Sequence, residues 1–224
     1  NRYSNMEYEI TIPTELKDIT LRQYKAYEKI IQANVTDQNS ERFINTKMLE
    51  IFCNIPFDYA SKMKLTDFVE IVDKINAMLM EKPDLVRFFQ MGDSEFGFVP
   101  NLEDMTFGEY IDLDNNIGDA EKIEYVMAVL YRPVKQKVGE RYSIHEYEPE
   151  LFREAMLNMP MDAVVSSILF FWNLGIDCTN AMMSYLSPQE RALIRQQEED
   201  SQINGDGRNL STNSLMEILQ GLKM

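Results

Sequence analysis

Histidine and cysteine are scarce in this sequence. Its 224 residues include one histidine, His145, and two cysteines, Cys53 and Cys178. The cysteines stand in different apolar stretches and form no Cys-x-x-Cys or Cys/His spacing, so we expect buried free thiols in a reducing compartment. Nucleophilic catalysis needs a histidine or an equivalent base in a shaped pocket, and His145 lies far in sequence from both cysteines. We expect His145 on the surface or on a hairpin, and we do not expect an enzyme.

Motifs that bind cofactors or metals are also missing. The sequence has no glycine-rich phosphate loop, no dinucleotide fingerprint and no HExxH zinc motif. Residues 112–116 (DLDNN) imitate the start of a calcium loop, but Ile117 stands where the loop needs glycine and Ile123 where it needs an acid. We therefore expect no cofactor and no metal site.

Basic residues are outnumbered by acidic ones, and no apolar run is long enough to span a bilayer. The chain carries 22 Lys and Arg against 37 Asp and Glu, a net charge of −15. Direct binding to nucleic-acid phosphates is not expected, because it needs clustered positive charge. The longest apolar run, 163–176, is interrupted by polar residues and is shorter than the ~20 residues of a membrane span. Residues 1–10 lack the apolar core of a secretory signal. We expect no membrane association.

Hydrophobic periodicity predicts a mainly α fold with one core. Capping boxes begin at Thr20, Thr106, Ser187 and Ser214, each with Glu or Gln three residues later. Helices are predicted over 21–31, 40–53, 66–80, 106–113, 119–131, 149–159 and 161–186, and from 188 to about 200. Alternation over 8–12 predicts a short strand. Apolar runs around Gly92 and Gly139 predict two short β-hairpins that project from the helical body.

The predicted organisation is a single helical domain over 1–200, a flexible linker over 201–213 and a C-terminal helix over 214–224. The linker is polar and contains glycine. The apolar side chains of the C-terminal segment fall on one side of a helix: Leu215, Ile218, Leu219 and Leu222. A short amphipathic helix on a flexible tether is typical of a docking peptide. The alternative is that this helix folds back on its own domain.

Charge is unevenly distributed between residues 103 and 141. Eight acids lie between Glu103 and Glu124, among them Asp112, Asp114 and Asp119. Four bases then cluster on the second predicted hairpin: Arg132, Lys135, Lys137 and Arg141. Two solvated faces would explain this order. Alternatively, the basic hairpin of one subunit meets the acidic segment of the next in a head-to-tail interface.

Several stretches carry a family resemblance. They are 12–13 (IP), 18–21 (DITL), 23–24 (QY), 96–102 (FGFVPNL), 105–114 (MTFGEYIDLD) and 130–133 (LYRP). Together they resemble small acidic helical proteins encoded among the virion and tail-assembly genes of tailed bacteriophages, crAss-like phages among them. The resemblance covers roughly residues 8–147. Its motifs are caps, turns and aromatic packing positions, so it assigns no functional residue.

The resemblance implies a non-enzymatic structural or assembly protein of a tailed-phage particle, in the neck or tail or packaged with the genome. Its expected partners are other phage structural proteins and copies of itself. Its expected location is the virion, after assembly in the bacterial cytoplasm. One alternative is a tail assembly chaperone, with which the 15 methionines are compatible because methionine-rich surfaces adapt to varied apolar partners. Another is an acidic decoy that binds a host enzyme by imitating nucleic-acid charge.

Overall fold

The computed structural model describes residues 10–34 and 40–185. Its elements, in chain order, are η1 (Leu16–Asp18), α1 (Leu21–Asn34), α2 (Ser40–Cys53), α3 (Phe57–Ala60), α4 (Leu65–Leu79), β1 (Phe88–Met91), β2 (Ser94–Phe98), η2 (Leu102–Asp104), α5 (Phe107–Asn116), η3 (Ala120–Lys122), α6 (Ile123–Leu130), β3 (Tyr131–Val138), β4 (Arg141–Ile144), α7 (Pro149–Met156) and α8 (Met161–Tyr185). The described chain is 60% helical, with eight α-helices and one four-stranded sheet. The largely helical prediction is therefore confirmed, while the sheet makes the fold mixed α/β.

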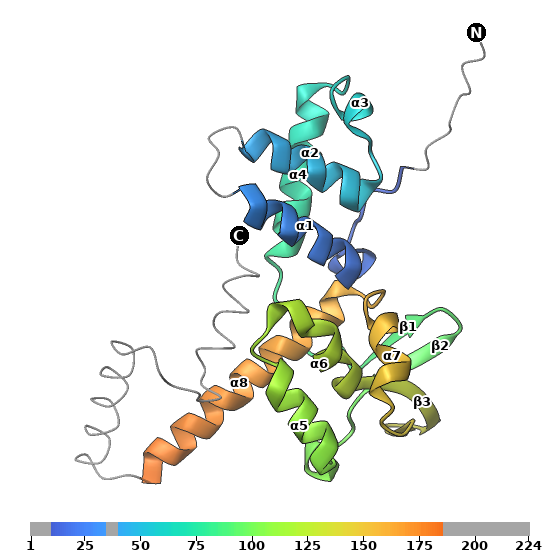
Figure 1. Cartoon of the computed structure of the whole chain (residues 1–224), viewed down its shortest axis with the longest axis vertical. Coiled ribbons are helices and arrows are strands. Elements are labelled where there is room, and N and C mark those ends of the chain that lie inside the picture. The colour runs from blue at the N-terminus through green and yellow to red at the C-terminus, as the bar shows by residue number, and fades with distance from the viewer. Residues whose placement is uncertain (1–9, 35–39, 186–224) are drawn as a thin grey trace.

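The molecule has two halves. Helices α1 to α4 form the upper half in Figure 1, and α5 to α7 with the sheet form the lower half. Helix α8 begins at the junction and extends down and outward. The longer upper helices bury apolar side chains on one side, as the spacing predicts: α4, for example, buries Val72, Ile75 and Met78. Between α1 and α2, the rings of Tyr27 and Phe52 meet edge to face, 5.1 Å apart.

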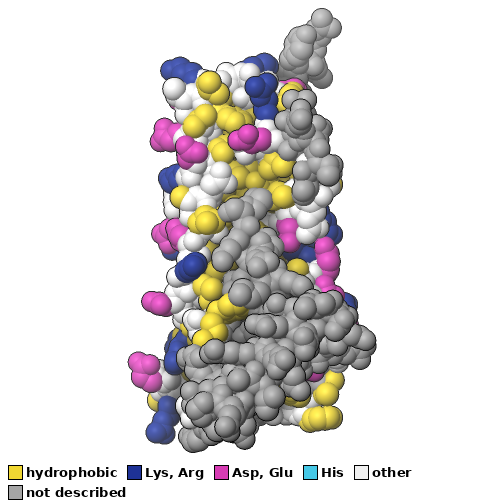
Figure 2. Space-filling view, turned by 90° about the vertical axis from the view of Figure 1, so that its left-hand side faces the viewer, with side chains coloured by type: hydrophobic (Ala, Val, Ile, Leu, Met, Phe, Trp, Pro, Cys, Tyr) yellow, Lys and Arg dark blue, Asp and Glu magenta, His cyan; other side chains and the backbone are white. Residues whose placement is uncertain are grey.

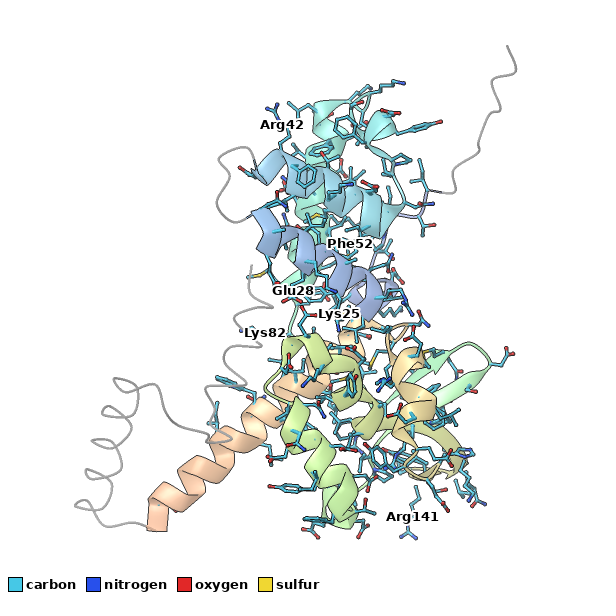
Figure 3. All side chains as sticks on the ribbon, in the orientation of Figure 1. Lys25, Glu28, Arg42, Phe52, Lys82 and Arg141 are labelled. Carbon is cyan, nitrogen blue, oxygen red and sulfur yellow. The ribbon has the colours of Figure 1, made fainter. Side chains whose placement is uncertain are left out.

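Backbone and side-chain bonds join the halves. The Leu21 amide donates to the Met159 carbonyl at 3.0 Å, and the Met161 amide donates to the Ile19 carbonyl at 2.9 Å. Lys25 of α1, labelled in Figure 3, forms a 2.6 Å ion pair with Glu124 of α6. Both side chains of this pair are largely buried, so solvent screens their attraction less than on an open surface. The start of α1 is thus fixed to the lower half.

Two predicted capping boxes set the starts of α1 and α5. In the first, the Gln23 amide donates to Thr20 Oγ1 at 3.3 Å, and the Thr20 amide donates to Gln23 Oε1 at 2.9 Å. In the second, the Thr106 amide donates to Glu109 Oε2 at 2.6 Å, and the Glu109 amide donates to Thr106 Oγ1 at 3.3 Å. Each pair satisfies backbone N–H groups that the first helical turn leaves without a partner. Both capping boxes are confirmed.

The two predicted hairpins are confirmed, but they do not project separately from the helices. They pair through β2 and β3 into one antiparallel sheet of order β1-β2-β3-β4, in which Phe96 faces Pro133 and Phe98 faces Tyr131. The inner strands carry the buried aromatic side chains Phe96, Phe98 and Tyr131 into the core. A two-stranded hairpin alone is marginally stable in water, and pairing plus burial of one face removes that weakness.

Glycine at position 97 allows an aromatic side chain to cross the sheet. A Cβ atom there would lie 3.0 Å from Tyr142 Cε2 and 3.1 Å from Val134 Cγ2, closer than side chains normally approach. With no side chain at this position, the Tyr142 hydroxyl reaches across and donates to the Phe98 carbonyl at 2.6 Å. The contact ties β4 to β2 across the intervening strand β3.

The centre of the lower half consists of α6 and the first two turns of α8. All eight residues of α6 are apolar except Glu124, and Met127 and Leu130 are fully buried. A helix that is apolar on nearly every side must be enclosed by other elements. Buried Ser166 of α8 donates to the Ala163 carbonyl at 3.1 Å and accepts from the Val86 amide at 3.1 Å. The hydroxyl is thus satisfied and links α8 to the segment before β1.

Some sequence predictions fail or fall outside the described residues. The strand predicted over 8–12 is wrong for residues 10–12, which are not assigned to a strand. The Thr11 amide instead donates to the Cys53 carbonyl at 3.2 Å. Alternation favours a strand only where a neighbouring strand can pair with it. The helix from 188, the linker 201–213 and the helix 214–224 lie outside the described residues.

Candidate protein interface

Of the four bases that the sequence groups together, Arg132 differs from the others because it is buried, at the start of β3. Its Nη2 atom lies 2.6 Å from Glu109 Oε1 of α5, and the two side chains are 9% and 4% exposed. The acidic segment and the basic hairpin therefore do meet, but inside one chain. A buried charge is strongly unfavourable without its partner, so this pair locks α5 onto the sheet. Arg132 and Glu109 are not available to a neighbouring subunit.

Tyr147 adds further contacts to the Arg132–Glu109 pair between β3 and α5. The guanidinium carbon of Arg132 lies 5.8 Å from the centre of the Tyr147 ring, within cation–π range. The Tyr147 hydroxyl donates to Asp112 Oδ2 at 2.6 Å. Burial of the Tyr147 hydroxyl raises the pKa of Tyr147 well above its usual value, and the hydrogen bond with Asp112 raises it further. Helix α5, strand β3 and the segment after β4 thus share one polar network.

Asp112 and Asp114 lie within helix α5, in the stretch that imitates a calcium loop. A helical segment cannot present successive ligands as an extended calcium loop does. Asp114 Oδ1 and Arg132 Nε are buried and have no hydrogen-bond partner among the described residues. Within 10–34 and 40–185, no group of three or more His, Cys, Asp or Glu side chains is placed to hold a metal ion.

The other three bases of the cluster are exposed toward the tip of the second hairpin. Lys137 forms a 3.0 Å ion pair with Glu95 of β2, and its Nζ atom lies 3.6 Å from the centre of the Phe88 ring. Lys135 and Arg141 are exposed, and Val138 between them is 71% exposed. Figure 3 places Arg141 at the lower end of the molecule. Lys135, Lys137 and Arg141 therefore remain candidates for an external contact, with Val138 as an apolar centre.

The last acids of the acidic segment form contacts within the chain. Asp119 caps η3 by accepting from the Glu121 amide at 3.0 Å, and it forms a 3.3 Å ion pair with Lys122. Glu124 pairs with Lys25, as described above. These acids stabilise a helix start and the junction between the halves. Of the predicted interface acids, Asp112, Asp114 and Asp119 are all partly buried.

Helix α5 also presents an exposed apolar face. Phe107 is 78% exposed, Tyr110 is 50% exposed and Ile111 is 37% exposed. Their spacing places them on one side of the helix, opposite the buried Glu109 and Leu113. We call these three residues the α5 face. An amphipathic pattern aimed at solvent is a recurring feature of protein interfaces.

A second exposed apolar face lies at the other end of the molecule. Exposed there are Leu65 (77%) and Val69 (44%), one turn apart on α4, and also Phe57 (63%) and Tyr59 (50%), which point to different sides of the short helix α3. We call these four exposed residues the α3–α4 face. Figure 1 shows α3 at the upper end and α5 at the lower end. Figure 2 shows hydrophobic side chains exposed on the upper half as well. The molecule thus presents apolar surface at both ends of its long axis.

An apolar groove lies between the halves. It has a volume of about 490 Å³ and is lined by η1, α1, the segment after α4, and α8. Its apolar lining includes Tyr24, Leu79, Met80, Leu169, Phe170 and Trp172. The charged side chains of Glu81, Lys82 and Asp84 are exposed at its rim. Figure 3 places Lys82 at the junction of the halves. A volume of this size is in the range of binding pockets.

The remaining predicted sites are partly placed. His145 is exposed just after β4, as predicted, and its backbone amide donates to the Pro133 carbonyl at 2.9 Å. Cys53 is a buried free thiol, also as predicted, and burial raises its pKa to about 11. The predicted docking residues of the C-terminal segment lie outside the described residues.

The described elements define a mainly helical α/β protein whose candidate site is a set of exposed apolar and charged surfaces. Comparison with protein-family models, with curated proteins and with solved structures finds no match to this chain. None of the described helices is both long and apolar enough to cross a membrane.

Proposed function

We propose that this protein is a non-enzymatic structural or assembly protein of a tailed-bacteriophage particle, acting through protein–protein contacts. The phage context comes from the resemblance carried by residues 8–147. The observation that favours a contact role is the exposure of large apolar side chains at both ends of the molecule. Its partners would be other phage structural proteins and copies of itself, and its place would be the virion.

The α5 face and the α3–α4 face carry most of this argument. Single exposed apolar residues are common, but Phe107, Tyr110 and Ile111 occupy one helix face together. Leu65 and Val69, one turn apart on α4, border a shallow depression that also touches Glu70 and Asp73. Aromatic and aliphatic side chains within a polar rim form the usual centre of a protein interface.

Contacts at opposite ends suit a protein that joins successive subunits. Two different faces that bind each other give a heterologous contact, which closes into a ring or continues as a filament. The pairing of Arg132 with Glu109 within one chain weakens the purely electrostatic version of this interface. We therefore propose an interface in which the exposed apolar side chains at the two ends make the main contacts. Exposed charged residues such as Lys135 and Arg141 would surround them.

The groove between the halves favours a second candidate function, a tail assembly chaperone. Its lining of aromatic and aliphatic side chains, with flexible Met80 56% exposed at the edge, could accept an apolar segment of an unassembled tail protein. Such a protein would bind its clients transiently and leave before the particle is complete.

Quantitative mass spectrometry of purified particles and of the matching infected lysate separates these functions. A fixed whole-number ratio to a known virion protein supports the structural role. Presence in the lysate with absence from particles contradicts the structural role and supports the chaperone. Salt-sensitive co-purification with a host DNA- or RNA-binding protein, without incorporation into particles, would contradict both and support the decoy.

A further inference from the structure

We propose that the groove between the halves is the docking site for the C-terminal segment 214–222 of the same chain. The inference goes beyond the proposed structural function and does not rest on it, and a groove filled in this way is closed to the client protein of the second candidate function. The groove residues are described, whereas the segment is known only by its sequence. Four observations support the pairing: the chemistry of the groove, the pattern of the segment, the length of chain between them and the position of α8.

The groove presents the surface that an amphipathic helix needs. Leu169, Phe170 and Trp172 contribute from α8, and Tyr24 and Leu79 contribute from α1 and α4. The Trp172 and Phe170 side chains are half-buried. Charged Glu81 and Lys82 border the apolar lining. An apolar channel with a charged edge is the usual acceptor of a helix with one apolar face.

The C-terminal segment supplies the complementary pattern. Leu215, Ile218, Leu219 and Leu222 stand at i, i+3, i+4 and i+7, the anchor spacing of helices that bind in grooves. On the opposite side of this helix would lie the polar residue Gln220. A tethered helix of this type exposes four large apolar side chains unless a surface covers them.

The chain between the two is long enough for the segment to return. Tyr185 ends α8, and Trp172 lies 13 residues before it, which corresponds to about 20 Å along the helix axis. The helix predicted from 188 to about 200 would add about 20 Å of stiff chain, and the linker predicted for 201–213 has a root-mean-square span of about 20 Å as a flexible chain, so the two together can cover the return path. A tether that can cover the distance holds the segment near the groove at an effective concentration of up to about millimolar order. A groove that binds the free peptide with a Kd of about 100 μM would then be occupied about nine-tenths of the time.

Trp172 provides the readout, because it is the only tryptophan in the chain and it lines the groove. In the full-length protein, Leu219→Asp should release the segment, red-shift the Trp172 emission and raise acrylamide quenching roughly twofold. Gln220→Asp adds the same charge on the opposite side of the helix and should leave both signals unchanged. A synthetic peptide of residues 210–224, added to the Leu219→Asp protein, should restore the original emission.

A substitution in the groove tests the same contact from the other side. Met80→Asp places a charge at an exposed position of the groove edge, so it should weaken docking without disturbing the core. The Trp172 emission of the unmutated protein should stay constant over a hundredfold dilution, since the tether is part of the same molecule. Identical emission and quenching in Leu219→Asp and unmutated protein would overturn the proposal. Emission that changes on dilution together with dimer dissociation would also overturn it, in favour of a second copy as the occupant.

Discussion

The two ends of strand β3 carry the same kind of charge and use it differently. Arg132 at the start of the strand and Lys137 near its end both form ion pairs, at 2.6 and 3.0 Å. The Arg132 side chain is 9% exposed and the Lys137 side chain is 38% exposed. Helix α5 and Tyr147 cover the start of the strand, whereas the tip extends into solvent. The order of charges along a sequence therefore does not tell whether a base serves its own chain or a neighbour.

Burial also changes the energetic weight of the two pairs. Water and salt weaken an exposed ion pair, and such pairs contribute about 0–1 kcal/mol. Loss of one partner from a buried pair leaves an uncompensated charge and costs about 3–5 kcal/mol. The start of β3 should therefore be essential to the fold, while its tip should be available for substitution and for contacts.

The largest effect is expected from Arg132→Met. It should lower the free energy of unfolding by about 3–5 kcal/mol, because the buried Glu109 carboxyl group would lose its partner. Chemical denaturation followed by circular dichroism measures the change. The double variant Arg132→Met with Glu109→Gln should recover much of the loss, since the glutamine removes the buried charge and still caps α5. A single variant as stable as the unmutated protein would contradict the lock.

Tyr131→Phe should have the next largest effect. The Tyr131 hydroxyl donates to the Val86 carbonyl at 2.8 Å and contacts the Ala163 carbonyl at 3.3 Å, and the residue is fully buried. Its loss leaves buried carbonyl groups without that partner and should cost about 1–3 kcal/mol. The matched variant Tyr142→Phe removes one bond at a half-buried position and should cost less. If chemical or thermal denaturation shows that both variants lower the free energy of unfolding equally, burial is not the deciding factor.

Asp18→Asn tests whether exposure alone makes a charge dispensable. Asp18 is exposed, yet its Oδ2 atom accepts from the Thr14 amide at 2.8 Å and from the Glu15 amide at 3.0 Å. The backbone bond from Thr14 lowers the pKa of Asp18, so its stabilisation is present above the ordinary carboxyl pKa and is lost as pH falls through the lowered value. Because the carboxylate is exposed, the variant should lower the free energy of unfolding by no more than about 1 kcal/mol at pH 7 and by little at pH 2. A loss that is independent of pH would contradict this assignment.

Lys137→Ala should have the smallest effect of these substitutions. The pair with Glu95 is partly exposed, so the free energy of unfolding should fall by less than about 1 kcal/mol. Its contact with the Phe88 ring is included in that range. Unfolding in low and high salt should show that the difference shrinks as salt rises. If Lys137→Ala lowered the free energy of unfolding as much as Arg132→Met, the proposed difference between the buried and the exposed ion pair of β3 would be wrong.

Local features of the fold are predictable from sequence because their causes are local. The capping boxes at Thr20 and Thr106 and the turn glycines Gly92 and Gly139 act within a few residues, and each marks an element that is present. The union of the hairpins depends on the pairing of β2 with β3, more than 30 residues apart in sequence. Nothing in either hairpin alone specifies that contact.

The candidate surfaces were predictable only in part. The exposed bases Lys135 and Arg141 were found from charge order, but the same reasoning included Arg132. One signal could have separated it: Arg132 directly follows the apolar helix 123–130 and Tyr131, so the chain is still inside the core at that point. The groove and the α5 face arise from elements distant in sequence, or from exposure of residues that a pattern alone assigns to a core.

Incorporation of an α5-face variant into particles tests the central claim most directly. A phage lacking the gene would be grown in cells that express the full-length protein, either unmutated, Phe107→Asp or Leu151→Asp. Phe107 is 78% exposed in the first turn of α5, and Leu151 is 63% exposed in the first turn of α7, so both changes add a charge to an exposed helix start. Both variants should fold normally.

Copies per particle are then counted by quantitative mass spectrometry. Our account predicts that Phe107→Asp lowers incorporation by at least about tenfold, as expected for a central interface residue, while Leu151→Asp matches the unmutated protein. Equal incorporation of all three proteins would contradict the claim that the α5 face holds this protein in the particle.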